Sequence, residues 1–329
     1  MILALRALGV GDLATAVPAL RGLRAAFPGE TLALAAPAWL TPLIDLIGGV
    51  DRMVPAEGLN GGDLPVADPA LAVNLHGRGP ESHRLLRNAR PARLWAFANA
   101  RARHLDGPAW DDDEHEVHRW CRLLRHYGIA AAESDLSLAV PAVAVTDGVT
   151  IIHPGAKSPS RRWPPVRYAA VARALSSAGH RVVVTGSAAE RDLAVRVALG
   201  AGLGVRAAQP TTLGELAGLI ARARLLISGD TGVAHLATAY GTPSVVLFGP
   251  VSPTRWGPPP DRPCHRAIWY GHRSEPGDRP EPGVHPALLA IDVAEVLTAA
   301  GVVDAGGPDV PVGRAISTPP ASRVGPCEE

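Results

Sequence analysis

The sequence predicts an α/β protein built from two doubly wound, Rossmann-like domains that face each other across a cleft. Short apolar runs alternate with segments of helical periodicity along most of the chain. A punctuated apolar stretch at 141–148 divides this alternation into two series. Each series runs for about 150 residues, an ordinary length for one domain. We therefore expect domains at 1–145 and 149–300, followed at 301–329 by a Gly- and Pro-rich tail that we expect to be disordered.

The first series opens with an apolar run that predicts a buried strand at 1–7. Apolar residues at helical spacing follow, and Pro28-Gly29 ends the predicted helix. Because strands and helices alternate, we expect a parallel sheet covered by helices. The expected strands are 1–7, 31–35, 53–54, 71–75 and 94–97, and the expected helices are 13–27, 42–47, 81–88 and 115–127.

The second series repeats the alternation. Thr211 or Thr212 can cap one of its helices, and Gly241 ends another. Ligands of doubly wound sheets bind beyond the carboxyl ends of the strands, so the informative residues should follow strands directly. The expected strands are 149–153, 181–185, 205–206, 225–228 and 244–248, and the expected helices are 165–178, 188–199, 212–223, 233–240 and 293–300.

Composition excludes several classes of protein. The 32 basic and 31 acidic residues give a net charge of +1, without the basic excess of a nucleic-acid binder. The three cysteines are widely spaced, which excludes a disulfide framework or a paired zinc motif and favours a cytoplasmic location. A membrane-spanning helix needs about 20 uninterrupted apolar residues, and prolines break the most apolar window, 31–50. Peripheral contact with a membrane stays open.

The strongest motif is the run at 229–235, where an apolar strand leads through a small-residue turn into a helix. Asp230 or Thr231 can cap this helix, and Gly232 allows a ligand to approach the backbone. The free N–H groups of its first turn form an anion-binding site. An ordinary capped helix explains the same local pattern. The continuation makes the motif specific, with Gly241-Thr242-Pro243 and then Phe248-Gly249-Pro250.

This long block resembles the glycosyltransferase family that includes the bacterial lipopolysaccharide heptosyltransferases. That family combines Asp-Thr-Gly-x-x-His-Leu with Gly-x-Pro and Phe-Gly-Pro. Two further blocks match it: Gly11-Asp12-Leu13 before a helix containing Pro18, and His153-Pro154-Gly155-Ala156 followed by Arg161-Arg162-Trp163-Pro164. The resemblance implies a GT-B fold, with the acceptor bound by the N-terminal domain and the nucleotide sugar by the C-terminal domain. It implies metal-independent, inverting transfer, and ADP-heptose is the donor most often linked to relatives.

Asp12 is the candidate catalytic base, because a carboxylate at a strand end can take the proton of an attacking hydroxyl. The alternative role is a helix N-cap. The resemblance implies that Arg161 binds the donor phosphates, and Lys157 and Arg162 compete for that role. The complete set expected at the donor diphosphate is Asp230, Thr231, Gly232, Val233, His235, Arg161, Lys157, Gly155 and Ala156.

Family members place a nucleoside-binding carboxylate after a strand, where this chain has Gly186 and Glu190. Glu190 could equally serve the helix dipole. Gly11, His76 and Arg78 are expected on the acceptor side. No metal is expected, because paired metal-ligand spacing is lacking and the acidic run 111–113 is typical of a solvated helix start. We expect no cofactor, since the nucleotide-diphosphate sugar is a substrate.

The acceptor hydroxyl could belong to a glycan, a glycolipid or a small metabolite. We expect a monomer without nucleic-acid partners. Two alternatives stay open: a sugar-nucleotide epimerase of the same fold, and a non-catalytic sugar-nucleotide-binding protein. A dinucleotide-dependent dehydrogenase is disfavoured, because Gly9-Val10-Gly11 is only part of the glycine fingerprint and no acidic ribose-binding residue follows the second strand.

Overall fold

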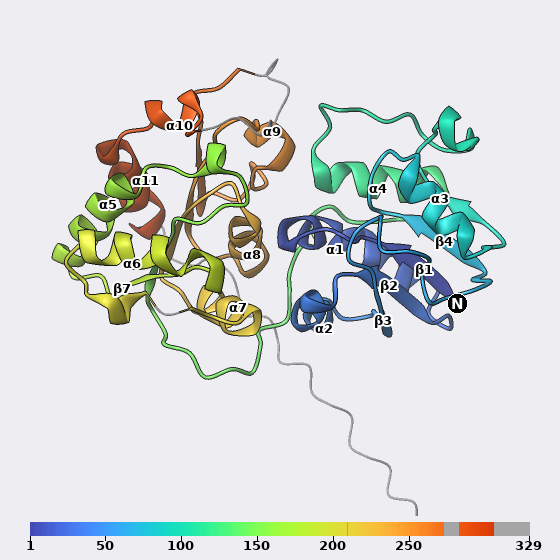
Figure 1. The fold of residues 1–329 in the computed structure, drawn as a ribbon, viewed down its shortest axis with the longest axis horizontal. Coiled ribbons are helices and arrows are strands. Elements are labelled where there is room, and N and C mark those ends of the chain that lie inside the picture. Colours follow the sequence, from blue (N-terminus) through green and yellow to red (C-terminus); the bar gives the residue numbers. More distant parts are fainter. Residues whose placement is uncertain (209, 273–282, 306–329) are drawn as a thin grey trace, which may run out of the picture.

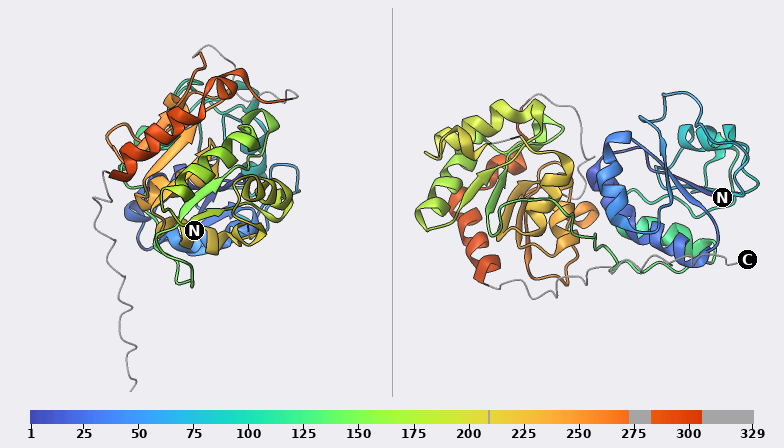
Figure 2. Two further views of the ribbon diagram at one scale, coloured as in Figure 1. Left: turned by 90° about the vertical axis from the view of Figure 1, so that its left-hand side faces the viewer. Right: turned by 90° about the horizontal axis from the view of Figure 1, so that it is seen from below.

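A computed structural model describes residues 1–208, 210–272 and 283–305. Two parallel sheets of five strands each form the centres of two α/β domains, seen side by side in Figure 1 and from two further directions in Figure 2. The strand orders are β3-β2-β1-β4-β5 and β10-β9-β8-β6-β7. Both are doubly wound orders, which confirms the predicted fold class.

The N-terminal sheet is centred on β1, whose Ile2 is in register with Leu32 on one side and Leu71 on the other. Its strands are β1 (Ile2–Leu5), β2 (Leu32–Ala36), β3 (Arg52–Pro55), β4 (Leu71–Asn74) and β5 (Leu94–Trp95). The helices of this domain are α1 (Val10–Ala26), α2 (Thr41–Ile47), α3 (Glu81–Asn88) and α4 (Glu116–His126), with short 3-10 turns η1 (Ala38–Leu40) and η2 (Ala100–Ala102).

The C-terminal sheet is built in the same way around β8 and β6. Its strands are β6 (Thr150–His153), β7 (Val182–Val184), β8 (Leu225–Gly229), β9 (Ser244–Leu247) and β10 (His265–Ile268). The α-helices are α5 (Pro165–Ser177), α6 (Arg191–Gly200), α7 (Leu213–Ala221), α8 (Gly232–Tyr240), α9 (Pro253–Trp256), α10 (Pro286–Ala290) and α11 (Val293–Ala305). The 3-10 turns are η3 (Pro159–Arg161), η4 (Ala188–Glu190) and η5 (Val205–Ala207).

Two expectations were wrong, and one strand was missed. The strand expected at 205–206 is the 3-10 turn η5, where Val205 is 54% exposed and so lacks the burial of a central strand. The fifth strand is β10, which sequence analysis missed because its two middle residues are exposed. Residues 301–305 of the expected tail continue α11, held by buried Val303 and by an ion pair between Asp304 and Arg224. Residues 306–329 lie outside the described part of the chain.

One apolar cluster joins the two domains. Val17 and Leu20 of α1 belong to the same buried cluster as Leu236 and Ala237 of α8. The helices α1 and α8 therefore pack against each other between the two sheets (Figure 1), and α2 packs against α7 beside them. Within the described residues, no helix is both long and apolar enough to cross a membrane. The domain limits proposed from sequence, at 145 and 149, fall in the irregular segment between α4 and β6.

Candidate active site

Asp12 lies in the first turn of α1, where two domains meet. Helix α1 begins at Val10, three residues earlier than expected, with Gly9 as its N-cap residue. One interpretation of the sequence made Asp12 the N-cap of this helix. The structure shows that it is not, because Gly9 holds that position. Asp12 Oδ2 instead accepts a hydrogen bond from the Gly9 backbone N–H at 3.1 Å, which stabilises the first turn of the helix. The Asp12 side chain remains 28% exposed, which leaves its carboxylate accessible to a substrate.

Arg6 organises the surroundings of Asp12, and sequence analysis gave it no role. It follows β1 directly and is wholly buried. Its Nε donates to the main-chain oxygen of Asp12 at 2.8 Å, and its Nη2 donates to Glu116 Oε1 at 2.9 Å. The same Nη2 lies 3.4 Å from Asp12 Oδ1. A buried charge needs a partner, so Arg6 inside an apolar run was a usable indication of a polar network.

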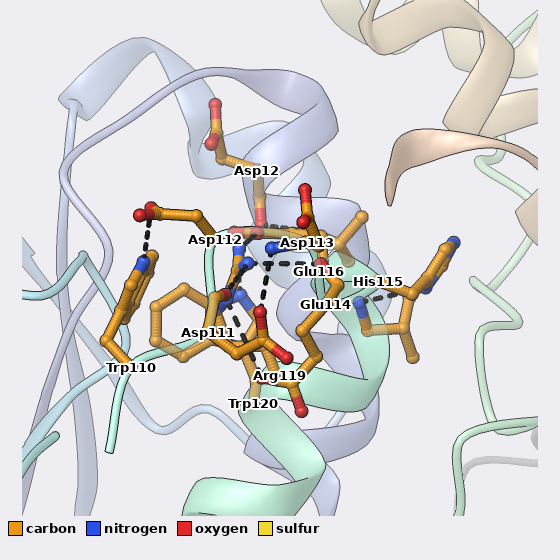
Figure 3. Close-up of polar contacts among 12 residues, drawn as sticks. Asp12, Trp110, Asp111, Asp112, Asp113, Glu114, His115, Glu116, Arg119 and Trp120 are labelled. Atoms are coloured by element: carbon orange, nitrogen blue, oxygen red, sulfur yellow. Dashed lines mark hydrogen bonds and ion pairs between the residues drawn. The ribbon is translucent and has the colours of Figure 1, made fainter. Parts of the chain in front are cut away.

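Helix α4 supplies two neighbours of Arg6, Glu116 and Trp120, and Figure 3 labels both. Trp120 Nε1 donates to Glu116 Oε1 at 3.0 Å, and Arg119 donates to the other oxygen of Glu116. The Arg6 guanidinium also lies 4.5 Å from the centre of the Trp120 ring. Burial alone would raise the pKa of Glu116, but Arg6 and Arg119 hold that pKa below its usual value. Glu116 is thus a buried, ionised carboxylate beside the candidate base.

The acceptor-side candidates from β4 differ in their surroundings. His76 is half-buried, and its burial together with nearby Arg6 lowers its pKa to about 4. The imidazole is therefore neutral near pH 7 and lies close to the guanidinium that holds Asp12. Arg78 is exposed and lies 3.5 Å from Asp112. His76 thus belongs to the inner group around Arg6, whereas Arg78 lies on the rim.

On the donor side, the structure joins two residues that are 69 positions apart. Arg161 Nη1 lies 3.1 Å from Asp230 Oδ2, and Asp230 is buried immediately after β8. A carboxylate next to a phosphate repels it, so Asp230 is better suited to orienting Arg161 than to binding the diphosphate itself. Thr231 is the N-cap residue of α8, but its side chain makes no capping hydrogen bond. The helix therefore begins without the side-chain cap expected from Thr231.

Gly232 and Gly11 have a packing role that sequence analysis did not predict. A Cβ on Gly232 would lie 2.6 Å from the Cβ of Val10, and a Cβ on Gly11 would lie 2.7 Å from Cδ2 of His235. Both glycines therefore allow the first turns of α1 and α8 to meet. The sequence interpretation held that Gly232 makes room for a ligand, and the structure fills that space with Val10 of the other domain. Val233, next in α8, is buried in the shared core.

His235 lies in this contact between the domains. Its ring meets the Trp256 ring edge to face at 5.7 Å. Burial is the main reason that its pKa falls to about 4, so the ring is neutral at physiological pH. A neutral imidazole in this place can donate one hydrogen bond and accept another, without adding charge to the donor site.

The nucleoside-side candidates meet where β6 and β7 end. Glu190 Oε2 accepts hydrogen bonds from Ser187 N at 3.0 Å and Ser187 Oγ at 2.8 Å. A Cβ on Gly155 would lie 2.3 Å from Glu190 Oε1, so Gly155 makes room for this carboxylate. Burial alone would raise the pKa of Glu190, but the Ser187 hydrogen bonds and nearby His153 keep it below its usual value. A Cβ on Gly186 would lie 3.3 Å from the Cβ of Glu190.

The remaining donor-side residues separate into a buried and an exposed group. Ala156 is buried, and its main-chain oxygen accepts a hydrogen bond from Arg162 Nε at 2.8 Å. Lys157 is exposed. Arg162 therefore stabilises the loop after β6, whereas Arg161 faces the turn before α8. In the described ranges, no group of three or more His, Cys, Asp or Glu side chains could hold a metal ion.

The acidic run before α4 also connects the two domains. Asp113 forms an ion pair with Arg255 of α9, and His115 Nε2 lies 3.0 Å from the main-chain oxygen of Gly257. His115 also caps α4 through its Nδ1, so this nitrogen is the acceptor and Nε2 is the donor. The run was expected to be a solvated helix start. Asp113 is indeed exposed, yet it also links the N-terminal domain to the C-terminal domain.

The arrangement places a partly exposed carboxylate next to an uncapped helix N-terminus of the facing domain. The first can accept a proton, and the second, with the cation Arg161, can stabilise negative charge on a departing group. A displacement that leaves a diphosphate needs both functions.

Comparison with known proteins agrees with this assignment. The sequence profile described as glycosyltransferase family 9 (heptosyltransferase) matches residues 100–275. Lipopolysaccharide heptosyltransferase 2 of Salmonella typhimurium is 27% identical over 342 residues, covering 88% of this chain and 94% of the relative. The solved E. coli ADP-heptose lipopolysaccharide heptosyltransferase II superposes with a TM-score of 0.74 at 22% identity, covering 93% and 98% of the two chains.

A second solved structure, an E. coli heptosyltransferase with ADP, superposes with a TM-score of 0.64 at 17% identity. It covers 84% of this chain and 96% of that one. These structural likenesses establish the GT-B fold, in agreement with the two parallel sheets. The sequence matches favour a transferase over the epimerase and over the non-catalytic binder. The protein is therefore a glycosyltransferase, and its chain belongs to glycosyltransferase family 9, the heptosyltransferase family.

Proposed function

We propose that this enzyme transfers a heptose from ADP-heptose to a hydroxyl group of a lipopolysaccharide-core acceptor, with inversion at the anomeric carbon. The names of its relatives support this donor and this acceptor class. The observation that carries the proposal is the position of Asp12, partly exposed in the helical turn that contacts α8 of the donor-side domain. Base and leaving-group site thus belong to facing domains.

The proposed reaction is a single displacement. The acceptor oxygen forms a bond to the anomeric carbon while the bond from that carbon to the diphosphate oxygen breaks. The acceptor proton passes to the Asp12 carboxylate, and ADP leaves with the electron pair. Arg161 and the first-turn N–H groups of α8 stabilise the charge that develops on the diphosphate. Glu190 is proposed to accept hydrogen bonds from the ribose hydroxyls.

The proposal includes the wider setting of the reaction. The enzyme acts as a metal-independent monomer in the cytoplasm and contacts the membrane only peripherally, through its lipid-linked acceptor. A lipopolysaccharide acceptor supports the membrane contact, since its lipid part lies in a bilayer. Activity in excess EDTA tests the metal independence, and vesicle co-sedimentation with and without the acceptor tests the membrane contact.

The central test is the substitution Asp12→Asn. Asparagine keeps an oxygen that can accept the Gly9 hydrogen bond but cannot take a proton, so turnover should fall at least 100-fold while the fold is kept. ADP release from ADP-heptose with truncated lipopolysaccharide as acceptor measures turnover, and thermal unfolding reports the fold. Asp45→Asn, on the exposed face of α2, is the matched control and should keep full activity.

Wild-type turnover in the Asp12→Asn variant would exclude Asp12 as the base. The donor is tested separately, by thermal shift with ADP-, GDP- and UDP-sugars. A selective shift with ADP-heptose supports the donor assignment, and a stronger shift with another nucleotide replaces it. Release of ADP that requires no acceptor would contradict the transferase reaction.

A further inference from the structure

We propose that Glu116 is a positioning residue that keeps Arg6 from neutralising Asp12, so that the Asp12 carboxylate stays a competent base. This inference deepens the proposed function, because it rests on Asp12 as the proton acceptor. It assigns a chemical purpose to the buried ion pair between β1 and α4, which the reaction scheme does not otherwise use.

The geometry divides the guanidinium between two carboxylates. Arg6 Nη2 lies 2.9 Å from Glu116 Oε1 and 3.4 Å from Asp12 Oδ1. The shorter, charge-assisted bond goes to Glu116. Arg6 nevertheless fixes the position of Asp12, because Nε donates to the main-chain oxygen of Asp12 at 2.8 Å. The base is thus held by its backbone, while its carboxylate keeps only a long contact with the cation.

Burial strengthens the ion pair between Arg6 and Glu116. Arg6 is wholly buried and the Glu116 side chain is 5% exposed, so solvent screens their attraction very little. Glu116 is fixed at both oxygens, by Arg6 and Trp120 at one and by Arg119 at the other. It cannot turn away from Arg6 without leaving buried donors unpaired. Figure 3 shows Glu116, Arg119 and Trp120 together beneath Asp12.

Charges of both signs surround this group, and Glu114 adds a third carboxylate 3.9 Å from Arg119. Arg6 and Arg119 face Glu116, and Asp12 is the second carboxylate within reach of Arg6. The other titratable or charged groups that act on this region are His76 after β4, His115 before α4, and His235 and Arg161 from the facing domain. His76 and His235 have pKa values lowered to about 4 and are neutral near pH 7.

Removal of the Glu116 charge would strengthen the contact between Arg6 and Asp12. Asp12 would become the carboxylate nearest to the buried Arg6, and Nη2 would be free to bind it. An arginine bound to a carboxylate favours its ionised form and weakens it as a base. If Arg6 contacted Glu116 alone, removal of the Glu116 charge would not have this effect on Asp12. The consequence is therefore specific to the division of Arg6 between the two acids.

The test compares Glu116→Gln with Glu114→Gln. Both changes remove the charge of a side chain that is at most 7% exposed, but Glu114 pairs with Arg122 and, at 3.9 Å, with Arg119 rather than with Arg6. The protein is labelled with ¹³Cγ aspartate, and the Asp12 signal is assigned by its loss in Asp12→Asn. In Glu116→Gln the midpoint of this titration should move down by about 1 pH unit. In Glu114→Gln it should not move.

Kinetics provide the second readout. In Glu116→Gln the acidic limb of the kcat–pH profile should move to lower pH in parallel, and the plateau kcat should fall several-fold because a weaker base accepts the proton less readily. The double variant Arg6→Gln/Glu116→Gln removes both charges, and its midpoint should return toward the wild-type value. A merely structural role for Glu116 predicts lower stability in every variant and an unchanged midpoint.

An unchanged or higher Asp12 midpoint in folded Glu116→Gln would overturn the inference. If that variant does not fold, Glu116→Asp keeps the charge on a shorter side chain, and the titration should then show a smaller downward shift; no shift overturns the inference. Different results would overturn the base assignment of Asp12 and the positioning role of Glu116. Wild-type turnover in Asp12→Asn removes the base assignment, whereas the ¹³C titration tests the effect of Glu116 on Asp12 without any substrate.

Discussion

At the scale of single residues, two glycines allow the first turns of α1 and α8 to meet. At Gly232 the nearest atoms belong to Val10 and Gly11 of the other domain, and at Gly11 they belong to His235. These contacts fix how far Asp12, one residue beyond Gly11, lies from the donor-side helix. In the proposed reaction this distance separates the base from the leaving group.

Gly232→Ala tests this packing. The new Cβ would lie 2.6 Å from Val10 Cβ and 3.0 Å from the Gly11 nitrogen, so the domains must shift apart. We expect a loss of about 1–3 kcal/mol in the free energy of unfolding, measured by urea denaturation. Gly214→Ala in α7 is the control, because its Cβ would meet nothing within 4 Å. That variant should gain roughly 0.5–1 kcal/mol, and equal effects of the two changes would contradict the packing role.

At the scale of elements, two helices of the same domain begin differently. Thr212 Oγ1 caps α7 by accepting from Glu215 N at 3.3 Å, and Glu215 Oε2 accepts a hydrogen bond from Thr212 N at 2.8 Å. Thr231 occupies the same position at α8, yet its Oγ1 is buried and, among the described residues, makes no hydrogen bond. Helix α7 is closed by its own side chains, whereas the N-cap residue of α8 provides no side-chain cap to its first turn.

Substitution of each threonine by alanine should separate the two roles. Thr212→Ala removes a capping box and should lower the free energy of unfolding by about 1 kcal/mol. Thr231→Ala removes no capping bond, so its stability should change by less than roughly half of that amount. Thermal or urea unfolding of both variants provides the comparison. A larger loss in Thr231→Ala than in Thr212→Ala would mean that Thr231 caps α8 in solution.

At the scale of the whole molecule, the two domains are held together by one apolar cluster and by polar contacts at its margin. The cluster contains residues of α1 and α8. At the margin, Asp113 pairs with Arg255, and Arg262 Nη2 donates to the main-chain oxygen of Ser134 at 3.0 Å. The candidate site around Asp12 lies at this contact, so its shape depends on both domains together.

Acid should destabilise the whole molecule in a defined pH range. Burial lowers the pKa of His76, His153, His235 and His265 to about 4, and histidine in an unfolded chain titrates near 6.5. Between these values the unfolded chain binds protons that the native protein excludes, so stability rises with pH and is lost as the pH falls from 6.5 to 4. Near pH 5, unfolding should take up about four protons.

Urea denaturation at several pH values measures this uptake as the slope of the free energy of unfolding against pH. His265→Asn removes one of the buried imidazoles and should reduce the slope by about one proton. His265 lies on β10, away from Asp12 and Arg161, which makes it the appropriate choice. A free energy of unfolding that stays constant between pH 6.5 and 4 would contradict the buried, neutral state of these rings.

The sequence by itself determined the features that depend on neighbours along the chain. The alternation of apolar runs and helical segments predicted two doubly wound domains, and Gly241 correctly ended α8. The block from Gly229 to Pro250 identified the family, because strand, turn and helix follow one another there in the same order as in its relatives. Asp12 was chosen as the candidate base for the same reason, since it follows the first strand within a short motif.

Only the tertiary structure decided which distant residues act together. Arg6 and Glu116 are 110 positions apart, and Arg161 and Asp230 are 69 apart. Hydrophobic periodicity and turn chemistry are local properties, so neither can pair such residues. Their pairing is set by the order of the strands and by the packing of α1 between α4 and α8. The candidate base was therefore readable in the sequence, whereas the charges around it are a property of the folded chain.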